Sequence, residues 1–195
     1  MAPPLFFATF CVVPFFALLA FAADWTVSNY PNPRTDFQMC SMTAAEANVC
    51  DPDGLLTTEE REKLNKALAE MSKSIGLGRG ESKCDKKGLT AVLAIANHIS
   101  KTANDQSNAA KKMSDGLMRR WHLDDECGKA FVMLVAVGDK KFWTSRMKGV
   151  PIVGTEFTRM FTDQKNLFRS GKYAEGLENI VKEIGNRMED KRRNN

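Results

Sequence analysis

Two aspartates and a glycine form the segment of this chain whose residue types and spacing most clearly suggest chemistry. In Asp51-Pro52-Asp53-Gly54, two carboxylates stand one residue apart, as in phosphatases that use an aspartyl nucleophile beside Mg²⁺. That chemistry needs the nucleophile at the end of a buried strand, and residues 45–50 do not have the pattern of one. The further acidic ligands of a Ca²⁺-binding helix–loop–helix are also missing. The segment is therefore interpreted as a turn before a helix, in which Asp-to-Asn changes at both positions should alter stability by about 1 kcal/mol or less.

A second acidic run, Asp124-Asp125-Glu126, is the other place where a cation could bind. Its carboxylates, together with Asp51 or Asp53, could hold Ca²⁺, because this ion prefers oxygen ligands. Acidic triplets are more commonly solvated loops. Asp51, Asp53, Asp124 and Asp125 are thus the candidate metal ligands of a chain whose sequence otherwise implies no cofactor.

The supply of acid–base and nucleophilic groups is small. Only His98 and His122 are available as histidine bases, and a nucleophile must have its base held beside it. His98 follows a predicted strand, with Ser100 and Thr102 close in sequence, but the chain has no Gly-x-Ser-x-Gly segment. No catalytic residue is assigned, and the sequence favours a binding protein over an enzyme.

The segments that must position these residues follow an α/β pattern. Two short apolar runs, 89–96 and 130–137, predict strands buried on both faces of a sheet, and 142–147 predicts the return strand of a hairpin. Thr57 and Glu60 form a capping box at a helix start, and Gly76, Gly78 and Gly80 predict a flexible connector after that helix. Apolar spacing predicts helices over residues 57–75, 105–121, 155–168 and 173–188. The expected fold is a single α/β layer sandwich, with a small mixed sheet of two parallel strands plus a hairpin, covered by about four helices.

The amino-terminal residues differ from the rest of the chain. Residues 1–22 contain no charged side chain and end Ala20-Phe21-Ala22, which predicts a signal peptide cleaved before Ala23. A retained membrane anchor is the alternative, although the apolar run is short for a span of about 20 residues. No later run is long enough to span a membrane, so none is expected after cleavage. The remaining chain divides into an arm (23–56), an α/β domain (57–188) and a basic tail (189–195), frayed after Gly185.

Four cysteines remain after cleavage, namely Cys40, Cys50, Cys84 and Cys127. In an oxidising compartment an even set indicates two disulfides with three possible connectivities, whereas a zinc site would favour a CxxC pair, which is absent. Cys84 and Cys127 each precede a buried strand by a few residues. If those strands are parallel neighbours, the two cysteines lie within bonding distance. We therefore predict the pairs Cys40–Cys50, which would pin the arm, and Cys84–Cys127.

Composition excludes several classes of protein. The chain has 195 residues, 43% of them hydrophobic and 27% charged, with a net charge of +4. These values do not fit collagen, a disordered chain or a protein with many membrane spans. The basic residues are spread along the chain rather than gathered in a stripe with interleaved aromatics, so nucleic-acid binding is not expected.

Several of these segments together resemble the modulator-of-levamisole-receptor family, a nematode branch of the TPM-domain proteins. The resemblance runs from about Tyr30 to Ile184. It rests on Tyr30-Pro31-Asn32-Pro33-Arg34, Cys40, Val49-Cys50-Asp51-Pro52-Asp53-Gly54-Leu55-Leu56, Cys84, Trp121 to Cys127, and Phe168-Arg169-Ser170-Gly171-Lys172-Tyr173 with Gly176-Leu177.

This resemblance implies a secreted or extracellular TPM domain that associates with acetylcholine-gated channels at the cell surface and tunes their gating by protein–protein contact. Other TPM-domain relatives are described as acid phosphatases, so a metal-assisted hydrolase is the alternative function. The family's receptor modulator carries a transmembrane helix, and here none is expected beyond the signal segment. The resemblance assigns no channel-contacting residue.

Overall fold

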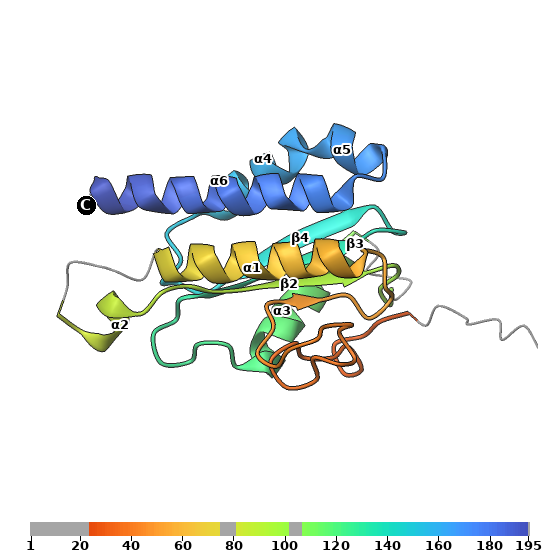
Figure 1. Ribbon diagram of the computed structural model, residues 1–195, viewed down its shortest axis with the longest axis horizontal. Helices are drawn as coiled ribbons and strands as arrows, with labels where there is room; N and C mark the ends of the chain where they lie inside the picture. The colour runs from red at the N-terminus through yellow and green to blue at the C-terminus, as the bar shows by residue number, and fades with distance from the viewer. Residues whose placement is uncertain (1–23, 75–80, 102–106, 195) are drawn as a thin grey trace, which may run out of the picture.

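The computed structural model describes residues 24–74, 81–101 and 107–194, which form a four-stranded sheet with helices on both faces (Figure 1). The strands lie in the order β1 to β4. The first three are parallel and β4 is antiparallel to β3. Their bounds are Val49–Cys50, Thr90–Ala96, Ala130–Ala136 and Lys141–Arg146. The α/β class, the parallel pair β2–β3 and the hairpin β3–β4 are as predicted. The signal segment and the glycine connector lie outside the described residues.

Strand β1 corrects the sequence analysis, which found no buried strand before Asp51. Val49 and Cys50 are both fully buried and pair in parallel register with Leu93 and Ala94 of β2. A strand of two residues shows no alternation of its own, so its sequence cannot reveal it. Asp51 therefore does stand at the carboxyl end of a buried strand.

Helix α1 (Thr58–Ser74) packs on β1 and β2, and α4 (Gly154–Asp163) packs on β4. The predicted capping box opens α1, where Thr57 and Glu60 exchange backbone-to-side-chain hydrogen bonds of 2.8 and 3.2 Å. Helix α6 (Tyr173–Arg193) packs across α1 and α4. These three helices cover one side of the sheet (Figure 1).

Two predictions about the carboxyl-terminal helices are wrong. The chain does not fray after Gly185, because α6 continues to Arg193 and Lys191 donates to the Glu156 carboxylate at 2.9 Å. The expected helix 155–168 is two helices, α4 and α5 (Lys165–Arg169), separated at Gln164. No glycine or proline marks this break, which the structure supports through a 3.0 Å hydrogen bond from Asn179 of α6 to the Gln164 side chain.

The other face of the sheet is covered by α3 (Ala109–Trp121) and by the amino-terminal arm. Tyr30 is the centre of the arm. It is fully buried, contacts Trp121 at a ring-centroid distance of 6.1 Å, and its hydroxyl lies 2.8 Å from the carbonyl of Ile95 and 2.9 Å from that of Cys50. The arm is thereby attached to the ends of β1 and β2 by side-chain contacts rather than by regular structure.

Both disulfides are formed with the pairing that the sequence analysis proposed. Cys40–Cys50 links the arm to β1 across a Cα separation of 4.2 Å. Cys84, in the short helix α2 (Lys83–Lys86), bonds to Cys127 across 5.3 Å, just before β2 and β3 begin. None of the described helices is long and apolar enough to cross a membrane.

Candidate functional site

Asp51 stands where β1 ends, at the edge of a parallel sheet where α/β folds commonly bind ligands. Its side chain is completely buried. Oδ1 accepts a hydrogen bond from the Leu55 amide at 3.0 Å, and Oδ2 accepts one from the Leu56 amide at 2.9 Å. Oδ2 also lies 3.3 Å from the guanidinium of Arg61. The carboxylate is therefore used within the protein to close the turn that leads into α1.

Arg61 is the charged partner that makes this burial possible. Its guanidinium also donates to the carbonyl of Ser41 at 3.0 Å, to the carbonyl of Leu56 and to the hydroxyl of Thr58. Burial raises the pKa of Asp51 above its usual value, and the two amides and Arg61 offset only part of that effect. An aspartate held in this way is a structural group, because removing its partners would leave buried charges unpaired.

Asp53 lies nearby but makes a separate set of contacts. Its Oδ2 accepts from the indole N–H of Trp25 at 2.9 Å and from the backbone amide of Asn97 at 2.7 Å. Trp25 in turn exchanges backbone hydrogen bonds with His98 and Ser100. Asp53 thus connects the turn after β1 to the residues that follow β2 and to the start of the described arm.

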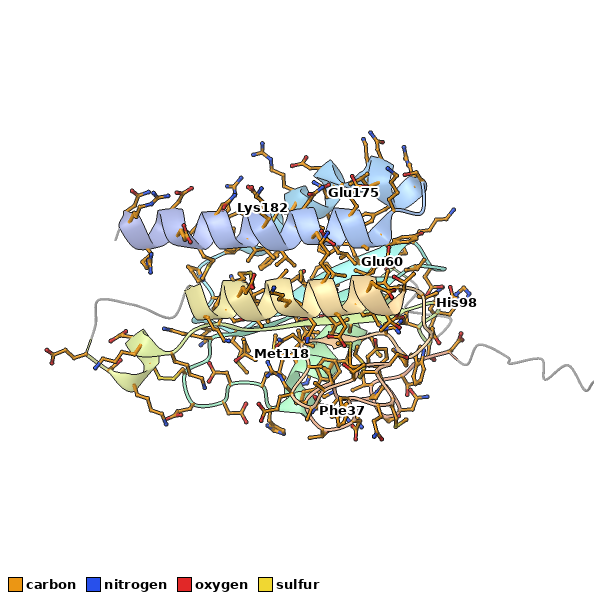
Figure 2. The ribbon with its side chains drawn as sticks, in the orientation of Figure 1. Phe37, Glu60, His98, Met118, Glu175 and Lys182 are labelled. Atoms are coloured by element: carbon orange, nitrogen blue, oxygen red, sulfur yellow. A yellow bond between two sulfur atoms is a disulfide. The ribbon has the colours of Figure 1, made fainter. Side chains whose placement is uncertain are left out.

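His98 and Asp139 meet at the same edge, after β2 and β3. The Nδ1 atom of His98 lies 3.0 Å from Oδ1 of Asp139, and the Ile99 amide donates to Oδ2 at 2.9 Å. Lys101 also donates to Oδ1. Burial alone would raise the pKa of Asp139, but the hydrogen bonds from His98, Lys101 and Ile99 outweigh it and lower that pKa below its usual value. Figure 2 shows His98 at the end of the molecule where α1 begins near Glu60.

The lowered pKa gives a prediction for the variant Asp139→Asn. At pH 7 it should unfold about 2 kcal/mol more easily than the wild type, because a buried carboxylate that is hydrogen-bonded to Lys101, His98 and the Ile99 amide is lost. An Asp pKa that is lower in the folded state stabilises the fold above the unfolded value of about 3.9, and this contribution is lost as the pH falls through the folded pKa. In urea unfolding, the stabilities of the wild type and of Asp139→Asn should therefore differ at pH 7 and converge in acid.

The exposed Asp163, paired with Arg159 at 3.9 Å with both side chains mostly in solvent, provides the matched control. Asp163→Asn should unfold like the wild type both at pH 7 and in acid, since exposed ion pairs contribute little. A difference between wild type and Asp139→Asn that is the same at neutral and acid pH would contradict the assignment of the effect to the ionised carboxylate.

The acidic run 124–126 lies at the opposite end of the sheet, before β3 begins. The Asp124 side chain is buried, bonded to Lys87 at 2.6 Å and to the amides of Cys127 and Lys129. The interpretation of this run as a solvated loop is therefore wrong for Asp124 and describes only Asp125 and Glu126, which are exposed. Asp124 fixes the loop that carries Cys127.

The candidate metal ligands are not brought together. Asp51 and Asp53 lie at the carboxyl ends of the parallel strands, whereas Asp124 and Asp125 precede β3. Within residues 24–74, 81–101 and 107–194, no three His, Cys, Asp or Glu side chains are grouped so that they could hold a metal ion. The edge of the sheet where the parallel strands end is called the carboxyl edge. Its carboxylates instead accept hydrogen bonds from amides and cations of the protein itself.

Sequence reasoning missed three residues of this edge: Trp25, Arg61 and Asp139. Asp139 lies between the two predicted strands of the hairpin, and its position one residue beyond Gly138 gave no sign of a partner 41 residues earlier. The signal available was topological, because His98 and Asp139 each follow a predicted buried strand and parallel neighbours end at one edge.

Comparison with known proteins adds three findings. The family model described as modulator of levamisole receptor-1 matches residues 25–140. Comparison with curated protein sequences gives no match. A solution NMR structure of the N-terminal domain of a protein from P. gingivalis is similar, with a TM-score of 0.61, 18% sequence identity, and coverage of 84% of this chain and 91% of that chain. At this identity the similarity concerns the fold alone.

Proposed function

The chain belongs to the modulator of levamisole receptor-1 family, and from this membership we propose that it acts outside the cell by binding and modulating an acetylcholine-gated, levamisole-sensitive channel. The family match over residues 25–140 is the observation that carries the proposal. The matched segment includes the arm, both disulfides, the helices α1 to α3 and the strands β1 to β3. The proposed partner is therefore a cell-surface receptor, which this protein would contact through the surface of its folded domain.

The two disulfides support the extracellular part of the proposal. Disulfides persist in secreted and extracellular proteins and are rare in the cytosol. Cys40–Cys50 and Cys84–Cys127 fix the two places where irregular chain meets the sheet. We propose that residues 1–22 direct the chain into the secretory pathway and are removed there.

Contact without catalysis is the mechanism that the carboxyl edge supports best. Asp51, Asp53 and Asp139 each accept hydrogen bonds from backbone amides or cations of the protein. A hydrolase of the metal-assisted type would need several of these carboxylates to converge on one ion. No observation on the described residues favours that alternative, so it is not proposed.

The proposal is tested by coexpressing the full chain with a levamisole-sensitive acetylcholine-gated channel in oocytes. A modulator should shift the half-maximal levamisole concentration by about fivefold, which corresponds to a modest coupling free energy between two sites. Two-electrode voltage clamp measures the shift, and affinity purification of the channel should recover the protein.

The matched control is the same chain without residues 1–22, which should stay inside the cell and leave the currents unchanged. An unshifted dose–response curve together with failure to copurify would contradict the proposal. An effect that is equally large without residues 1–22 would contradict its extracellular part.

A further inference from the structure

A groove, called the hairpin groove below, lies between the β3–β4 hairpin and the helices α4, α5 and α6, on the side of the sheet away from α3. Its volume is about 600 Å³, which falls within the range of roughly 300–1,000 Å³ for small-molecule sites. Figure 1 shows the hairpin turn and α5 at the same end of the molecule. The family match ends at residue 140, so most of the groove is built from residues beyond the matched segment.

Aromatic rings form the apolar wall of the groove. Phe142 of β4 stacks on Phe161 of α4 with a ring-centroid distance of 4.3 Å and an interplanar angle of 8°. Phe168 of α5 stacks on Tyr173 of α6 at 5.9 Å, and lies 6.1 Å from Phe161. Phe161 is buried, whereas the other three rings are half-buried and line the groove with part of their surface. This wall suits an apolar or aromatic ligand body.

Four cations surround the aromatic wall: Lys140, Lys141, Lys165 and Arg169. All four are exposed, and none of the described residues that line the groove is acidic. Among the ion pairs of residues 24–74, 81–101 and 107–194, none involves these four side chains. Elsewhere on the surface the cations are commonly paired, as in Lys63–Glu178 and Lys83–Glu126.

The nearest acidic side chains in sequence are directed to other partners. Asp139, which precedes Lys140, binds His98 and Lys101. Asp163, two residues before Lys165, pairs with Arg159. The positive charge around the groove is therefore left without a carboxylate of the protein, and its electrostatic potential favours an anion.

Two other grooves of comparable size lack this property. The groove between α1 and α6 is lined by both signs of charge, including Lys63 and Glu178, which pair with each other. The groove between α4 and α6 likewise contains the pairs Arg159–Asp163 and Arg187–Glu183. Among the three grooves compared, only the hairpin groove combines an apolar wall with charged side chains that are all positive.

We propose that the hairpin groove binds a small anionic amphiphile, with an apolar chain or ring against the aromatic wall and a carboxylate held by Lys141, Lys165 and their neighbours. The ligand class follows from the two surfaces, since an apolar body alone would not need the cations and an inorganic anion would not need the rings. The site is independent of channel modulation, so either proposal can fail while the other holds.

Isothermal titration of the full secreted chain with decanoate tests the site. Decanoate should bind one to one with a dissociation constant on the order of 0.1 mM. Decyltrimethylammonium, which has the same chain length and the opposite charge, should not bind measurably. Raising the NaCl concentration from about 50 to about 500 mM should weaken decanoate binding about twofold or more, because exposed charges are screened.

Charge reversal locates the site. The double variant Lys141→Glu/Lys165→Glu should weaken decanoate binding about fivefold or more. The matched control, Arg119→Glu/Lys148→Glu, makes the same change in net charge at two exposed cations that lie outside the groove, and should bind like the wild type. Circular dichroism and thermal melting check that each variant is folded.

Ring protons observed by NMR give a readout that does not depend on the charge variants. Decanoate should shift the resonances of Phe142, Phe168 and Tyr173, and leave those of Trp25 unchanged. Equal affinity for decanoate and decyltrimethylammonium, an unchanged affinity in the groove variant, or no heat and no ring shifts at 1 mM decanoate would each overturn the proposal. Binding of an acidic peptide at this groove without decanoate binding would likewise overturn it.

Discussion

Replacing Asp51 with Asn should lower the free energy of unfolding by about 3 kcal/mol, because breaking a buried ion pair leaves an uncompensated charge. The side chain of Asp51 is completely buried and that of Arg61 is 10% exposed. Asn retains one acceptor oxygen, so one of the two amide bonds from Leu55 and Leu56 must also be lost. The burial seen in the structure replaces the expectation of about 1 kcal/mol or less that a simple turn would give.

Urea denaturation of Asp51→Asn beside Asp125→Asn measures this effect. Asp125 is a matched control because it is also an aspartate that contacts one side chain, His122 at 2.7 Å, but both side chains are largely exposed. Its variant should stay within about 0.5 kcal/mol of the wild type. A loss below about 1 kcal/mol for Asp51→Asn would show that the turn and Arg61 adjust without the carboxylate.

Removing the Cys84–Cys127 disulfide should cost about 4 kcal/mol. The bond closes a sequence separation of 43 residues, and the chain-entropy model assigns this amount to the freedom regained by the unfolded chain. The double variant Cys84→Ala/Cys127→Ala avoids free thiols, and both positions lie outside the main core, Cys84 in α2 before β2 and Cys127 in the loop before β3. Most of the expected loss therefore belongs to the cross-link itself.

The comparison for this prediction is Cys40→Ala/Cys50→Ala. That bond spans only 10 residues, so the same model gives about 3 kcal/mol, to which the loss of buried sulfur packing is added because both cysteines are fully buried. Guanidinium unfolding monitored by fluorescence measures both variants. If the Cys84–Cys127 variant lost less than about 1 kcal/mol, the loop would already be ordered in the unfolded chain by other contacts.

The sequence by itself determined the helices α1, α3 and α6 and the two buried strands β2 and β3. The apolar residues of α1, α3 and α6 repeat at helical spacing, and the two buried strands are almost continuous apolar runs. The pattern of side chains alone therefore predicts which of these segments are helices and which are strands. Parallel pairing of these strands also led to the Cys84–Cys127 pair, because the starts of parallel neighbours lie at one end of a sheet. The capping box at Thr57 was likewise visible, since both of its partners lie within four residues.

The contacts at the carboxyl edge were decided only by the tertiary structure. Strand β1 has two residues and exists because β2 offers it an edge to pair with. Asp53 meets Trp25 and Asn97 across 28 and 44 residues, and His98 meets Asp139 across 41. Such contacts leave no periodicity in the sequence, because they depend on which strand ends the fold places side by side.

Contacts between residues distant in the sequence also decided which aspartates of the two acidic segments are buried. From sequence, Asp51 and Asp124 were both aspartates in polar, loop-like segments, and their burial depended on partners elsewhere in the chain. Arg61 reaches back over Asp51 from the first turn of α1, and Lys87 reaches Asp124 from the loop before β2. Sequence determined which groups could carry charge, whereas the packing of strands and helices decided which of them are buried, paired and unavailable to a ligand.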